Sequence, residues 1–181
     1  MKSLSNRQRL VLQALGLGFA GGLRSWPPLG MMALTYDVAP ATSGWKRWPV
    51  LRNPWGRRAL IALAAAEPIA DKWPNTIPRT QVKPQLTHID GGILGRTALD
   101  AIAGAALGSE YPEKNATILG AAVSGVAALL GNFVGQRVRQ AVADSTKLPD
   151  YTVAAIEDVI SILPLVAVAR SRGVRLARRG A

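Results

Sequence analysis

The stretch ATILGAAVSGVAALLGNFVGQ, residues 116–136, contains no charged side chain. A helix needs about 20 mostly apolar residues to cross the hydrocarbon core of a bilayer. Glu113 and Lys114 precede the stretch, and Arg137 and Arg139 follow it. The sequence therefore predicts a membrane-spanning helix with charged residues beyond both of its ends.

Four further runs are long and partly apolar. They cover residues 10–36, 58–73, 91–108 and 150–169. The first contains Arg24 and the pair Pro27-Pro28, which removes two amide donors and should kink or break the helix. The run 58–73 is acidic in its second half, so a soluble amphipathic helix is the alternative there. We predict one all-α membrane domain over residues 1–181, a helix bundle of about five spans with a broken first helix.

The N-terminal segment has features of a signal peptide, because Lys2, Arg7 and Arg9 precede an apolar run. The apolar run continues past Arg24, and further spans follow it. We therefore interpret this segment as the first membrane helix, which is not cleaved.

The orientation in the membrane is not decided by charge. Five spans place the two termini on opposite sides, and the basic residues then divide almost evenly between the two sides. The Arg-rich tail, residues 170–181, favours a cytoplasmic C-terminus. That location requires either an external N-terminus or a first helix that does not cross fully.

The composition excludes several kinds of site. The chain has no Cys and a single His, His88. Disulfides, thiol nucleophiles, His-clustered metal sites and a Ser–His–Asp triad therefore lack their residues. We predict no cofactor, no metal and no enzymatic activity, and a lipid-acting intramembrane enzyme is the least favoured alternative.

The formal net charge of +11 raises the question of nucleic-acid binding. The basic residues do not follow one helix face but lie in the gaps between apolar runs, where membrane proteins meet lipid headgroups. Three tryptophans in one such gap, Trp45, Trp48 and Trp55, suit the same layer. The sequence predicts a multi-pass protein of a bacterial inner membrane, with membrane lipid rather than nucleic acid as its partner.

Polar residues within or beside the apolar runs are the candidate binding residues, because an ionisable group at membrane depth costs a few kcal/mol or more. They are Arg24, Ser25, Glu67, Asp71, Arg96, Asp100, Glu157 and Asp158. Glu67 and Asp71 are four residues apart and share one helix face. Arg96 and Asp100 have the same spacing, which favours a structural salt bridge within their helix.

Two interpretations of these charges stay open. Neighbouring carboxyl groups in a low dielectric can carry a proton or coordinate a cation. Alternatively, the carboxylates only pair with Arg24 and Arg96 and hold helices together. Glu157 and Asp158 are adjacent and point in different directions, so we expect at most one of them to face a given partner.

Short matches suggest an internal repeat. Gly18-x-x-x-Gly22-x-Arg24 resembles the pattern of residues 131–137, and residues 65–67 resemble residues 155–157, each with a Pro seven residues after its Glu. In a five-span protein these matches form an inverted repeat of two plus one plus two spans, an arrangement known in transporters. A competing match pairs Arg24-Ser25 with Arg96-Thr97. The spacing Gly18-x-x-x-Gly22 also allows close helix packing.

Several motifs resemble the bacterial membrane family known as domain of unknown function 4126. They are Gly22-Leu23-Arg24-Ser25 with Pro28, Glu67-Pro68-Ile69-Ala70-Asp71-Lys72 with Pro74, Pro78 and Arg79, Gly95-Arg96, and Glu157-Asp158. The resemblance covers nearly the whole chain and implies a membrane location with little stated chemistry.

The expected function is that of a small transporter, exporter or translocator with a charged site near the membrane midplane. Glu67, Asp71 and Glu157 would bind a proton or cation, and Arg24 and Arg96 would balance charge or hold an anionic group. The alternative is a structural or assembly protein of the membrane. Five spans enclose little volume, so a homodimer acting on an unidentified small substrate or ion is also consistent with the sequence.

Overall fold

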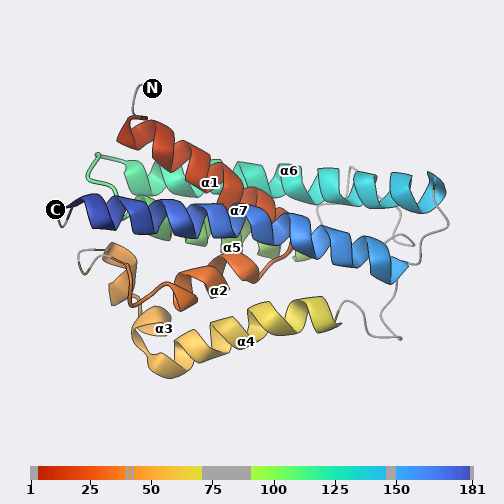
Figure 1. Ribbon diagram of the computed structural model, residues 1–181, viewed down its shortest axis with the longest axis horizontal. Helices are drawn as coiled ribbons and strands as arrows, with labels where there is room; N and C mark the ends of the chain where they lie inside the picture. Colours follow the sequence, from red (N-terminus) through yellow and green to blue (C-terminus); the bar gives the residue numbers. More distant parts are fainter. Residues whose placement is uncertain (1–3, 40, 42, 71–90, 146–149, 180–181) are drawn as a thin grey trace.

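The computed structural model describes residues 4–39, 41, 43–70, 91–145 and 150–179, and all regular structure within them is helical (Figure 1). The helices are α1 (Asn6–Leu23), α2 (Pro27–Leu34), the short 3-10 helix η1 (Gly44–Arg47), α3 (Pro49–Arg52), α4 (Pro54–Ala70), α5 (Gly91–Gly108), α6 (Ala116–Ser145) and α7 (Asp150–Arg179). The predicted all-α class is therefore confirmed.

The first apolar run is broken, as predicted. Helix α1 begins after Ser5, whose hydroxyl and backbone form a reciprocal capping box with Gln8. It ends before Arg24, which is extended at φ −142° and ψ 126°. Helix α2 begins at Pro27-Pro28, where proline suits the first turn because it has no N–H to leave unpaired.

The chain reverses direction at this break. Helix α1 runs parallel to α6, because Gly18 packs at Ser124 and Gly22 packs at Gly131. Helix α2 runs in the opposite direction beside α4, where Gly30 packs against Ala64. In Figure 1, α2 accordingly returns toward the end of the molecule where α1 begins.

Aromatic contacts fix the end to which α2 returns. Tyr36, just after α2, packs edge-on against Trp45 with ring centroids 5.7 Å apart. The Trp45 indole N–H donates to Glu110 just after α5, at 2.8 Å. The next residue, Tyr111, donates its hydroxyl proton to Gln13 in the first half of α1. The start of α1 and the end of α2 therefore lie at the same end of the bundle.

The structure thus corrects the prediction of one span over residues 10–36. Helices α1 and α2 form a helical hairpin, while α6 and α7, with 30 residues each, run along the length of the bundle (Figure 1). The cause is the extended segment from Arg24 to Trp26, which turns the chain instead of bending one continuous helix. The start of α1 and the end of α7 consequently lie at the same end (Figure 1).

The predicted inverted repeat is not supported, because α1 and α6 run in the same direction instead of opposite directions. Helix α6 also continues without a break through Arg137, the residue that matches Arg24. Gly22 and Gly131 do meet, so the matching glycine motifs mark a packing interface between two helices.

The remaining helices differ from the predicted runs mainly in length. Helix α5 has the predicted bounds, whereas α6 and α7 extend beyond residues 136 and 169. Residues 71–73 of the predicted run 58–73 lie outside the described residues. Within the described residues, two helices are long and apolar enough to cross a membrane, Ala116–Val142 and Thr152–Ser171. The predicted five-span bundle is not confirmed.

Small residues bring α1, α5 and α6 into close contact. A Cβ added at Gly22 would overlap the Ala128 carbonyl, and one added at Gly104 would overlap the Gly120 carbonyl. Such backbone contact through glycine is typical of helices packed in membranes. The glycine spacing in the sequence therefore corresponds to real interfaces.

Many large apolar side chains are exposed, in addition to those that form the buried core. Large apolar side chains are exposed along the outer helix faces, whereas several charged and polar side chains are buried. The exposed set includes Leu12, Leu63, Ile102, Ile118, Val126, Leu130, Val134, Ile156, Val159, Ile160, Leu163 and Val166. Only 39% and 28% of the residues in the two apolar helix windows are buried, unlike the core helices of soluble domains.

Candidate functional site

The Arg24 side chain lies fully inside the bundle, at the turn between α1 and α2. Its Nη2 atom is 2.6 Å from Oδ1 of Asp158 and 3.9 Å from Oε2 of Glu157, both on α7. The same Glu157 oxygen is 3.2 Å from Nη1 of Arg139 on α6. Alternating charges therefore connect the hairpin turn to α6 and α7.

The adjacent residues Glu157 and Asp158 both reach Arg24, which corrects the expectation that only one would. Asp158 approaches directly, and the longer Glu157 side chain spans the gap to both Arg24 and Arg139. Part of the interhelical pairing expected for Arg24 is thus present.

Glu67 on α4 accepts two backbone hydrogen bonds, from the N–H of Ser25 at 2.9 Å and from that of Trp26 at 3.0 Å. The Trp26 side chain makes no capping hydrogen bond of its own. The first N–H groups of a helix need acceptors and favour negative charge. Glu67 therefore caps α2 from a neighbouring helix and holds the turn in place.

Asp100 on α5 is fully buried, and neither of its carboxylate oxygens has a hydrogen-bond partner in the described part of the chain. It lies against α1 at Gly21, where an added Cβ would overlap the carboxyl group. Arg96 and Glu67 lie near enough for their charges to interact electrostatically with the Asp100 carboxyl group. Asp100 is thus a buried carboxyl group beside the Arg24 turn.

The predicted salt bridge between Arg96 and Asp100 is absent, although both residues are described. Asp100 is directed across the interface toward Gly21 of α1, while Arg96 one turn earlier is half-buried. Spacing of four residues permits a pair only if both side chains lean toward each other along their helix.

Comparison with protein-family models, with curated proteins and with solved structures found no match. The resemblance to the family of domain of unknown function 4126 therefore stays a prediction. What this site does must be argued from its own geometry.

The structure brings most of the predicted site residues to one place. Arg24, Ser25, Glu67, Glu157 and Asp158 meet at the hairpin turn, and Asp100 lies beside it. Asp71 lies outside the described residues.

Arg139 belongs to the site but was assigned to the flank of a span, because the charge-free stretch ends at residue 136. Helix α6 continues to Ser145 and carries Arg139 into the bundle, where only 5% of it is exposed. The signal in the sequence is a spacing, since Gly135 lies four residues before Arg139 and therefore on the same helix face. In the structure this face meets α7, where a Cβ added at Gly135 would lie 3.4 Å from Oε1 of Glu157.

A cavity of about 140 Å³ adjoins the charged cluster between α1, α6 and α7. Arg139 and Glu157 are its charged lining residues, and the rest of the lining is mainly apolar, including Leu23, Val138 and Ile160. No group of three or more His, Asp or Glu side chains among the described residues is placed to hold a metal ion. Space for a small ion or solute therefore exists beside the charge network.

Among the described residues, carboxyl groups outnumber guanidinium groups at this site. Glu157 and Asp158 pair with the buried Arg24 and Arg139, Glu67 binds the backbone of the hairpin turn, and Asp100 lies at Gly21 beside it. If the half-buried Arg96 is counted, the carboxyl groups still exceed the cations. A cluster with formal negative charge in a low dielectric attracts a cation or retains a proton.

Proposed function

We propose that this protein is a multi-pass protein of a bacterial inner membrane that moves a proton or small cation through the charged cluster around Arg24. The observation that supports this proposal most directly is the position of the cluster at the turn of the α1–α2 hairpin. Non-helical backbone at membrane depth is tolerated where protein or a water-filled cavity surrounds it. Substrate sites in transporters commonly occur at such helix breaks.

The depth of the turn supports this proposal. Gly22, two residues before Arg24, packs at Ala128 and Gly131, which are midway along the apolar window Ala116–Val142. If α6 crosses the bilayer, the Arg24 turn lies near the midplane. Charges at that depth are costly unless they are paired or used.

The re-entrant path also suggests an orientation. Basic residues of the described chain gather at the end of the bundle that contains the start of α1 and the end of α7. They are Arg7, Arg9, Lys46, Arg47, Arg52, Arg57, Arg58, Lys114 and Arg170. Exposed Arg137 lies in the opposite half. The positive-inside rule then places both termini in the cytoplasm.

Asp100 is the residue we assign to cation or proton binding. The Glu67 carboxylate is engaged by the hairpin backbone, and Glu157 and Asp158 are engaged by guanidinium groups. The Asp100 oxygens accept no hydrogen bond from the described residues. A carboxyl group that is buried without a protein partner can exchange its proton or cation without breaking a structural ion pair.

A structural role for the same charges is the second candidate, and one observation favours it. The pairs of Arg24 with Asp158 and of Arg139 with Glu157 join three helices at short distances. Such a network could serve only to hold the hairpin against α6 and α7. In that role Asp100 could lose its charge without any functional consequence.

Ion flux in proteoliposomes separates the two candidates. Purified protein is reconstituted into vesicles that contain a dye selective for H⁺, for Na⁺ or for K⁺, and a membrane potential is imposed in the presence of the matching cation. We expect a flux above that of empty vesicles with one of these cations, and we expect Asp100→Asn to reduce it at least about tenfold. Glu113→Gln, an exposed carboxyl after α5, is the matched control and should leave the flux unchanged.

The proposal is overturned if the wild-type protein carries none of the three cations, or if Asp100→Asn carries them as well as the wild type. The thermal stability of both variants is measured in detergent alongside the flux. A folded Asp100→Asn protein without flux supports the transport role, whereas a folded variant with full flux supports the structural one.

A further inference from the structure

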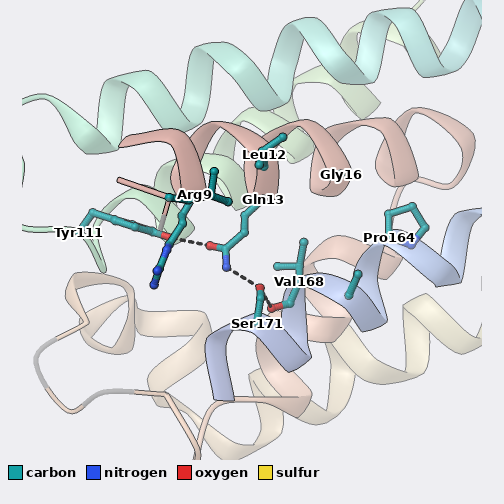
Figure 2. Close-up of a pocket in the computed structure, with 10 residues that line it drawn as sticks. Arg9, Leu12, Gln13, Gly16, Tyr111, Pro164, Val168 and Ser171 are labelled. Carbon is teal, nitrogen blue, oxygen red and sulfur yellow. Dashed lines mark hydrogen bonds between the residues drawn. The ribbon is translucent and has the colours of Figure 1, made fainter. Parts of the chain in front are cut away.

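A second and larger cavity, of about 650 Å³, opens between the first half of α1 and the second half of α7 (Figure 2). The two helices are antiparallel, so Gln13 lies opposite Ser171, and Gly16 lies opposite Pro164 and Val168. The cavity therefore has a polar outer end and an apolar inner end.

Hydrogen bonds fix the polar wall of this cavity. The Tyr111 hydroxyl donates to Oε1 of Gln13 at 2.6 Å, and Nε2 of Gln13 donates to the Ser171 hydroxyl at 2.6 Å. Ser171 donates in turn to the Val168 carbonyl at 2.8 Å. Figure 2 shows Gln13 at the centre of this chain. The amide nitrogen of Gln13 carries a second hydrogen, which remains available to a ligand.

Arg9 supplies a positive charge at the same end of the cavity. Its side chain is half-buried, and its guanidinium forms no ion pair or hydrogen bond with the described residues. Ser171, in the same lining, is the last residue of the apolar window Thr152–Ser171. In a membrane, this end of the cavity would therefore lie at the level of the lipid headgroups.

We propose that this cavity binds one anionic phospholipid. The lipid phosphate contacts the Arg9 guanidinium and the free amide hydrogen of Gln13, and an acyl chain lies along Gly16, Pro164 and Val168. The size of the cavity is within the range of small-ligand sites. Basic pockets between membrane helices on the cytoplasmic side suit anionic headgroups. This inference rests on the membrane location proposed above but not on the transport activity.

An amphiphile fits better than a free anion because most of the lining is apolar. Leu4, Leu12, Pro164, Ala167 and Val168 would leave an inorganic phosphate without partners along most of the cavity. A neutral lipid would leave the Arg9 charge uncompensated at the boundary of an apolar cavity, and a zwitterionic lipid would bring its own cation beside the phosphate that Arg9 contacts. The combination of one cation, one amide donor and an apolar groove favours a phosphate ester with acyl chains.

Native mass spectrometry of the full chain in detergent tests this site, with phosphatidylglycerol as the anionic probe and phosphatidylcholine as the zwitterionic one. The wild type should retain one phosphatidylglycerol in preference to phosphatidylcholine. Arg9→Gln should weaken phosphatidylglycerol binding about tenfold, because a charge-assisted hydrogen bond is lost. Arg7→Gln is the matched control, since Arg7 is exposed two residues away and does not line the cavity. It should change the affinity less than about twofold.

A second pair of variants tests the apolar part. Ala167→Phe places a ring in the groove and should weaken the binding of both lipids, whereas Ala155→Phe, exposed elsewhere on α7, should not. Equal losses for Arg7→Gln and Arg9→Gln would show non-specific surface attraction and overturn the proposal. Displacement of the lipid by millimolar inorganic phosphate would also overturn it. Because binding is measured in detergent, failure of cation flux in vesicles leaves this result unaffected.

Discussion

The Arg24 guanidinium lies 2.6 Å from the Asp158 carboxylate, although the two residues are separated by most of the chain. Arg24 occupies the turn of the α1–α2 hairpin and Asp158 lies on α7. This ion pair joins the least regular part of the bundle to one of its longest helices. It makes the hairpin turn depend on the correct placement of α7.

Removing one member of this pair should destabilise the protein strongly. Asp158→Asn leaves the Arg24 charge buried with weaker compensation, and breaking a buried pair costs about 3–5 kcal/mol. The double variant Arg24→Met, Asp158→Leu removes both charges and should recover most of the lost stability. Thermal unfolding in detergent measures the effect. A double variant no more stable than Asp158→Asn would contradict the pairing.

Glu67 should act as a helix cap across the interface between α4 and α2. Glu67→Ala removes the acceptor for two backbone N–H groups and should cost about 1–3 kcal/mol. Glu67→Gln keeps one carbonyl oxygen as an acceptor, so its cost should be smaller. The order of melting temperatures, wild type above Glu67→Gln above Glu67→Ala, is the expected result. Equal stability of all three proteins would rule out the cap.

Gly22 should tolerate no side chain, because an added Cβ would overlap the backbone of α6. Gly22→Ala forces the helices apart and should lower the free energy of unfolding by about 1–3 kcal/mol. Gly95, with nothing within 4 Å of an added Cβ, is the control. Gly95→Ala should stabilise its helix by about 0.5–1 kcal/mol. Opposite signs for the two variants, measured by thermal unfolding, are the expected result.

If the protein crosses the membrane as proposed, the α1–α2 hairpin predicts which positions share one side of the membrane. Because the chain has no Cys, single cysteines can replace the exposed residues Ser5, Asp37, Glu113 and Ser145. The first three should react with a membrane-impermeant maleimide only from the cytoplasmic side, and Ser145→Cys only from the other side. Labelling of intact spheroplasts and inverted vesicles gives the comparison. If Ser5→Cys and Asp37→Cys react from opposite sides of the membrane, the hairpin is ruled out and residues 10–36 cross the membrane completely.

Helix positions were largely predictable because they depend on local patterns. The charge-free stretch of residues 116–136 lies within α6, and the run 91–108 matches α5. A break at Pro27-Pro28 was also predicted, since two consecutive prolines cannot donate helix hydrogen bonds. In the structure α1 ends a few residues earlier, at Leu23, and the two prolines begin α2. The direction of the chain after the break was not predictable. The returning helix is capped by Glu67, which lies 42 residues after Ser25 and 41 after Trp26.

The sequence predicted which residues belong to the candidate site better than it predicted which of them form ion pairs. The cost of burying charge marked Arg24, Asp100, Glu157 and Asp158 before their contacts were known. The ion pairs that these residues form depend on contacts between different helices. Asp100 faces Gly21 on α1 instead of Arg96 on its own helix, because a glycine leaves room for the carboxyl group there.

The sequence alone determined that this protein is helical and that its first apolar run breaks, because hydrophobic runs and consecutive prolines act over a few residues. Only the tertiary structure decided that α1 and α2 return to one end, that Arg139 joins the site, and that α1 and α6 run in parallel. These features depend on contacts between residues far apart in the chain. Local patterns specify the polarity of a helix face but not the helix that will cover it.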